Sequence, residues 1–136
     1  MKTTMTTKIA LLFSGLIITG IGVAVLFFPT PFYATNGIEL GTDPSLLNEV
    51  RASGGALIGA GGLILAGFFV STLATLSMIV AAGLYGMYGV SRLFSMAIDG
   101  VPDSGLIGAA GFELFVSAFC LFLLIRERAK ARQVIA

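Results

Sequence analysis

The sequence predicts an all-α membrane protein in which four spanning helices run alternately up and down as a four-helix bundle. Of its 136 residues, 57% are hydrophobic and only 11% are charged, and the mean hydropathy is +1.00. A soluble domain of this size could not bury so much apolar surface. We therefore expect a single transmembrane domain over residues 1–136.

Basic residues gather at the two ends of the chain, and they determine the predicted topology. Short flanks rich in Lys and Arg stay in the cytoplasm, so both termini should be cytoplasmic and the number of crossings even. The basic tail at residues 126–136 is expected to lie on anionic lipid headgroups, which makes membrane lipids expected partners. Six of the eight basic residues lie at these ends: Lys2, Lys8, Arg126, Arg128, Lys130 and Arg132.

The first helix is predicted at about residues 9–28, where an apolar run of 20 residues ends at Pro29. At about 1.5 Å per residue, this run matches the roughly 30 Å hydrocarbon layer. A cleaved signal peptide is the alternative. It is disfavoured because the apolar stretch of a signal usually has only about 7 to 15 residues and because no small-x-small cleavage site follows.

The second helix is predicted at about residues 44–71, after an outer loop at 29–43. The loop contains Asn36-Gly37, a strong turn signal. Asp43 can cap the helix, and Pro44 suits its first position because the missing N–H has no helical partner there.

The stretch from Ala52 to Val90 carries no charge for 39 residues, nearly twice the length that crosses a membrane. It must therefore form two crossings, with a turn near Ser71 and Thr72. The third helix is predicted at about residues 73–98 and is stopped by Asp99-Gly100-Val101-Pro102. The fourth helix follows at about 104–126.

Small residues form two stripes at helical spacing, and such stripes let helices approach closely in lipid. We expect both stripes to pack inside the bundle, with a dimer interface as the alternative. The first stripe consists of Gly55, Gly59, Gly62 and Ala66, and the second of Ala82, Gly86 and Gly89.

Glu113 lies inside an otherwise apolar run, where a carboxylate is expensive unless it is paired, hydrated or protonated. Each outer helix end can be located from its cap or stop signal. Measured from those ends, Arg51, Arg92 and Glu113 all lie about 10 to 14 Å deep at the helical rise of about 1.5 Å per residue. The sequence therefore predicts one charged cluster in the outer half of the bundle.

Helical spacing adds further candidates around this cluster. Two interpretations are favoured over a proton or ion relay, for which the sequence shows no continuous polar path to the cytoplasmic side. In the first, the charges form an internal salt bridge that fixes helix register. In the second, they line an outward-facing polar pocket for an anionic or amphipathic small molecule, which the excess of arginine over Glu113 favours. The complete set of candidate ligand-binding residues is Arg51, Arg92, Glu113, Asn48, Glu49, Tyr85, Tyr88 and Asp99.

The composition argues against most catalytic chemistry. Histidine is absent, which removes the commonest metal ligand and the usual neutral-pH general base. The single cysteine, Cys120, lies deep in an apolar run, and no zinc spacing or nucleotide-binding loop is present. We expect no metal, no cofactor, no nucleic-acid partner and no catalytic residue, although an enzyme that uses other residues stays open.

Several segments carry a resemblance to a known family. They are Leu47-Asn48-Glu49-Val50-Arg51-Ala52-Ser53-Gly54-Gly55, Ser91-Arg92-Leu93, Asp99-Gly100-Val101-Pro102, and Glu113. Through them nearly the whole chain resembles a family of small bacterial membrane proteins catalogued only as a domain of unknown function. More distantly, the chain is similar to the DoxX-like four-helix membrane proteins. The resemblance implies four helices and a bacterial inner-membrane location, and it implies no catalytic role.

Two functions therefore compete at this point. The first is binding of a small amphipathic or anionic molecule in the outer polar pocket. The second is that of a non-catalytic accessory or assembly subunit, in which the charges are structural and the glycine faces contact another membrane protein or a second copy.

Overall fold

The computed structural model describes residues 3–133 and confirms the all-α class, with no strand within that range. Four long helices account for most of the chain, and each is long and apolar enough to cross a membrane. They are α1 (Met5–Phe27), α3 (Pro44–Phe69), α4 (Ala74–Asp99) and α5 (Ser104–Gln133). Two short elements, α2 (Pro29–Ala34) and the 3-10 turn η1 (Ser71–Leu73), connect them.

Local sequence signals determine several helix ends. The carboxylate of Asp43 accepts a hydrogen bond from the backbone N–H of Leu46 at 2.7 Å, which caps α3 directly before Pro44. At the other end of the third crossing, Gly100 adopts a φ of +102° and terminates α4. Glycine adopts this positive φ without strain because it has no Cβ. The chain can therefore turn sharply here and enter α5.

Two segments differ from their sequence-based description. The expected outer loop contains the short helix α2, because Pro29 and Pro31 suit the first turn of a helix as well as they end the previous one. The last helix continues to Gln133, so the basic tail is helical as far as it is described. Residues 134–136 of that tail lie outside the described range.

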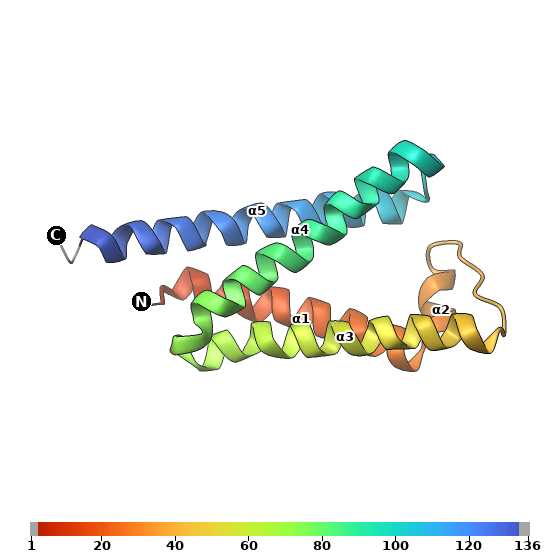
Figure 1. The fold of residues 1–136 in the computed structure, drawn as a ribbon, viewed down its shortest axis with the longest axis horizontal. Coiled ribbons are helices and arrows are strands. Elements are labelled where there is room, and N and C mark those ends of the chain that lie inside the picture. Colours follow the sequence, from red (N-terminus) through yellow and green to blue (C-terminus); the bar gives the residue numbers. More distant parts are fainter. Residues whose placement is uncertain (1–2, 134–136) are drawn as a thin grey trace.

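The long helices form two hairpins that meet at one end of the molecule. Helix α1 packs along α3, and α4 packs along α5. In Figure 1 the start of α1 and the end of α5 lie at the same end of the molecule as η1, and we call this end the terminal end. From there α4 diverges from α3 toward the opposite end, which carries α2 and the Gly100–Asp103 turn and which we call the loop end (Figure 1).

The α1–α3 contact depends on glycines that sequence spacing did not single out. A Cβ added at Gly54 would lie 2.7 Å from the backbone nitrogen of Leu26, and one at Gly22 would lie 2.8 Å from the carbonyl oxygen of Gly54. Both distances are closer than atoms can approach, so glycine is what allows the backbones to touch.

The predicted packing of the Gly55, Gly59 and Gly62 stripe inside the bundle is wrong. These glycines are exposed, and a Cβ added at each would meet nothing within 4 Å. The face of α3 that carries Gly54 packs on α1, and this turns the stripe outward. The stripe on α4 does pack as predicted, because an added Cβ at Gly89 would lie 2.6 Å from Leu114 of α5.

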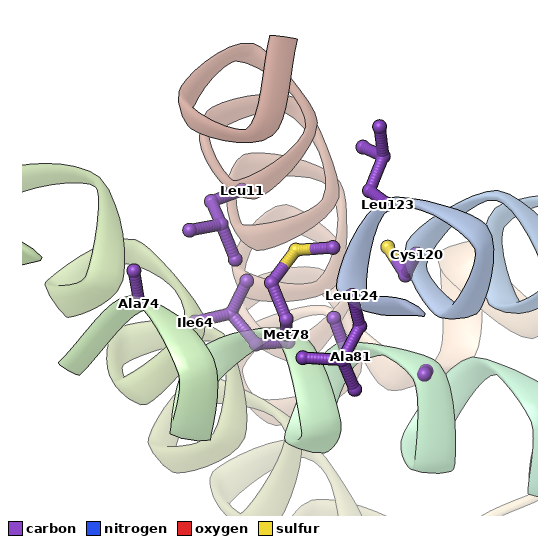
Figure 2. Close-up of a cluster of buried hydrophobic side chains, with 9 residues drawn as sticks. Leu11, Ile64, Ala74, Met78, Ala81, Cys120, Leu123 and Leu124 are labelled. Carbon is purple, nitrogen blue, oxygen red and sulfur yellow. The ribbon is translucent and has the colours of Figure 1, made fainter. Parts of the chain in front are cut away.

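The main apolar core lies toward the terminal end, where all four long helices converge. Figure 2 shows its side chains, which come from α1, α3, α4 and α5. Outside this core, large apolar side chains such as Phe13, Phe69 and Phe115 face outward, as lipid-facing residues do. The core consists of Leu11, Ile64, Ala74, Met78, Ala81, Ala82, Cys120, Leu123 and Leu124.

Candidate functional site

The predicted attraction between Arg92 and Glu113 is present as a bidentate ion pair. Arg92 Nε donates to Glu113 Oε2 at 2.8 Å, and Arg92 Nη2 donates to Glu113 Oε1 at 3.2 Å. The pair joins α4 to α5. The side chains retain 30% and 12% of their exposure, respectively, so the pair is shielded from the surroundings without being sealed in the core.

The ion pair lies on the wall of a cavity between the two hairpins. The cavity has a volume of about 540 Å³ and is lined from every helix at the loop end. It exists because α4 and α5 diverge from α1 and α3 there, while the large core holds the terminal end together. A volume of this size falls within the range that holds one drug-sized molecule.

The cavity has a floor made by a second small core. Ile18, Leu57 and Tyr85 are almost fully buried and pack together there. The hydroxyl of Tyr85 donates a hydrogen bond of 2.7 Å to the backbone carbonyl of Ser14. This bond joins α4 to α1 and satisfies the buried hydroxyl, so Tyr85 supports the floor, and Tyr88 lines the cavity one turn closer to the loop end.

The segment at 29–43 supplies a roof over the cavity. Phe32, Tyr33, Asn36 and Ile38 all line it. Asn36 also reaches the start of α5, since a Cβ added at Gly105 would lie 2.7 Å from Asn36 Oδ1. The roof therefore extends from one hairpin to the other.

Arg51 does not join the predicted cluster, and this expectation is corrected. Its side chain is exposed, and its Nη1 donates to the backbone carbonyl of Leu26 instead. Leu26 lies in the last turn of α1, where carbonyls have no partner within the helix and carry partial negative charge. Because α3 packs on α1, Arg51 lies closer to this helix end than to Glu113.

Three further candidates also lie away from the cavity. Asn48 and Glu49 are exposed on the first turns of α3 and do not line it. Asp99 is exposed and accepts a hydrogen bond from Ser95 at 2.9 Å. The contact is with the residue one turn earlier on the same helix, so Asp99 does not neutralise an arginine here. Of the eight predicted site residues, the structure places Arg92, Glu113, Tyr85 and Tyr88 at the cavity.

Sequence reasoning missed the buried carboxylate of Glu127 at the terminal end. This side chain is only 3% exposed. Its Oε1 accepts a hydrogen bond from the Thr7 hydroxyl at 2.8 Å and one from the backbone N–H of Thr4 at 3.1 Å. A signal was available, because Glu127 follows Glu113, Ser117 and Cys120 on one helical face, although it lies among the basic residues of the tail.

Within residues 3–133, no group of three His, Cys, Asp or Glu side chains could hold a metal ion. The polar groups at the cavity can hydrogen-bond a guest and orient it. The one pair of full charges that lines it is mutually neutralised.

Comparison with known proteins gives a family without an assigned activity. No curated protein and no solved structure matches the chain. A domain of unknown function matches residues 6–124, which covers all four long helices except for Met5 of α1 and the last turns of α5. The chain therefore belongs to the family described as Domain of unknown function (DUF4345).

Proposed function

We propose that this protein lies in the bacterial inner membrane and binds a small amphipathic molecule in the cavity at the loop end. The observation that carries the proposal is the Arg92–Glu113 pair on the wall of a 540 Å³ cavity. If the ion pair served only to hold α4 against α5, it would not need a cavity next to it. The combination of apolar walls with a few convergent polar groups is typical of small-molecule sites.

The proposed topology places the cavity in the outer half of the membrane. The described parts of both termini lie at the end opposite the cavity. With basic flanks retained in the cytoplasm, the loop end faces outward. A molecule could then reach the cavity from the outer leaflet or from outside the cell.

Native mass spectrometry of protein released gently from lipid tests the proposal. A small molecule retained at one copy per chain is the expected result. Ile21→Phe should reduce its retention because Ile21 lines the cavity and the larger ring takes up part of the space beside it. Val23→Phe is the matched control, since Val23 lies two residues away and is 39% exposed on the outside of α1. Equal retention in both variants would contradict the proposal.

A second candidate function is that of an accessory subunit. The observation that favours it is the outward stripe of Gly55, Gly59 and Gly62, which the bundle itself does not use. The same mass spectra report subunit number. The accessory subunit would be favoured over the binding protein by two results together. The unchanged protein would carry a second copy or another protein that Gly59→Leu does not carry, and no spectrum would show a retained small molecule.

A further inference from the structure

The charges at the cavity restrict the class of molecule that it can hold. Glu113 uses both carboxylate oxygens on the single guanidinium of Arg92. Arg51, which would have made the cluster positive, lies at the end of α1 instead. Among the residues that line the cavity, Arg92 and Glu113 are the charged ones, so the lining has no net charge.

A charged guest would gain little from such a lining. An anion beside Arg92 would be attracted by the guanidinium and repelled by the paired carboxylate of Glu113, so the repulsion offsets part of the attraction. The anion would also lose its hydration. An uncharged polar group loses far less on leaving water.

The two sides of the cavity differ in polarity. The α1 side consists of Ile17, Ile18, Ile21 and Val25, which are all aliphatic. The α4 side presents mostly residues with hydrogen-bonding groups, together with the apolar Met96: Tyr85, Tyr88, Ser91, Arg92 and Ser95. A guest that matches both sides has an apolar body and one polar end.

Arg92 also determines which polar atom that end should carry. A guanidinium has five N–H donors, and two of those in Arg92 bind Glu113. The others can donate to an uncharged oxygen, such as a hydroxyl or a carbonyl, without breaking the ion pair.

We infer that the cavity holds one uncharged amphipathic molecule, whose oxygen-bearing end lies at Arg92 and whose apolar body lies against the α1 side. This inference rests on the proposed function and names its ligand class. It narrows the sequence-based expectation, which included anions, because the structure removes Arg51 from the site.

A tryptophan reporter can test the ligand class, because the chain contains no tryptophan of its own. Phe112→Trp places the fluorophore on the cavity lining. Phe115→Trp places it on the same helix with the original side chain 66% exposed and outside the lining, so it reports quenching from the bilayer alone. Tyr88→Trp is a second cavity reporter in case Phe112→Trp does not fold.

The probes are a brominated long-chain alcohol and the sulfonate with the same brominated chain, each added to protein in zwitterionic lipid nanodiscs. The alcohol should quench the cavity reporter saturably and beyond the Phe115→Trp control. Its apparent Kd should be at least about tenfold lower than that of the sulfonate. Adding Glu113→Gln leaves Arg92 unpaired, so the sulfonate should then gain cavity-specific quenching.

The outcomes separate the two proposals. In the reporter protein without Glu113→Gln, the sulfonate could quench saturably and at least as strongly as the alcohol. That result would overturn the inferred ligand class but would still support a binding site in the cavity. If neither probe quenches the cavity reporters beyond the Phe115→Trp control, the proposed function fails and the inference fails with it.

Discussion

The hydroxyl of Thr7 donates a 2.8 Å hydrogen bond to the buried carboxylate of Glu127, and so joins the first turn of α1 to the far end of α5. These residues are 120 positions apart in the chain. The contact holds α1 against α5 at the terminal end of the bundle, on the side of the large apolar core that faces away from the cavity. The cavity lies beyond that core, where the hairpins diverge.

Thr7→Val should destabilise the protein. The substitution keeps the size of the side chain but removes the donor to a buried carboxylate, and hydrogen bonds to charged groups contribute about 1.5–3 kcal/mol. Thr6→Val is the matched control, because Thr6 is exposed on the neighbouring face and should change stability by less than about 0.5 kcal/mol. Unfolding in mild detergent measures both, and equal effects would refute the role of the hydrogen bond.

Gly54→Ala should destabilise the protein, while Gly55→Ala should not. The added methyl group at Gly54 meets the backbone of Leu26 at 2.7 Å, and overpacking of this kind typically costs about 1–3 kcal/mol. At Gly55 the methyl group meets open space, and replacing a helical glycine by alanine favours the helix by up to about 1 kcal/mol. Unfolding in detergent compares the two. A larger loss of stability in Gly55→Ala than in Gly54→Ala would mean that α3 packs on α1 through the face that carries Gly55.

A double-mutant cycle should reveal coupling between Arg92 and Glu113. Each single change to Gln leaves one charge without its partner, while the double change removes both charges. The sum of the stability losses in the two single variants should therefore exceed the loss in the double variant by about 1 kcal/mol or more. Because both side chains retain some exposure, each loss should fall below the roughly 3–5 kcal/mol of a fully buried pair.

Arg51→Gln provides the control for this cycle. Arg51 is exposed and binds a backbone carbonyl, so its loss should show no coupling to Glu113→Gln. Coupling as large as that of Arg92 would return Arg51 to the cluster that the sequence predicted.

The proposed topology predicts which residues a membrane-impermeant maleimide can reach. In a Cys120→Ser background, Glu39→Cys should be labelled in spheroplasts, and Arg128→Cys should be labelled only after the membrane is permeabilised. Both original side chains are exposed. Glu39 lies between α2 and α3 at the loop end, and Arg128 lies in the last turns of α5 at the terminal end. Labelling of Arg128→Cys in sealed spheroplasts would place the terminal end outside.

Part of the candidate site was predictable from the sequence. Glu113 stands out because a carboxylate in an apolar run is rare, and helix ends marked by Asp99 and Ser104 place it at the same depth as Arg92. The cluster inferred from that depth count is correct for the pair and wrong for Arg51. Depth fixes the position of a residue along a helix, but it does not say toward which neighbouring helix the side chain points.

The cavity and the Glu127 contact could not be predicted in this way. The cavity depends on the divergence of two hairpins, and its roof depends on α2, which occupies a segment that carries loop and turn signals. Glu127 lies among basic residues that indicate a lipid-facing tail. Its burial follows only once Thr4 and Thr7 lie beside it.

The number of long helices and several of their ends follow from the amino-acid sequence, because hydropathy, the rise per residue, the Asp43 cap and the stop at Gly100 are local properties. The partners of each helix follow only from the tertiary structure. In lipid, apolar surface does not drive helices together, so association depends on the fit between residues far apart in the chain. That fit selects Gly54 over Gly55 for the contact with α1, separates Arg51 from Glu113, and leaves the cavity beside Arg92.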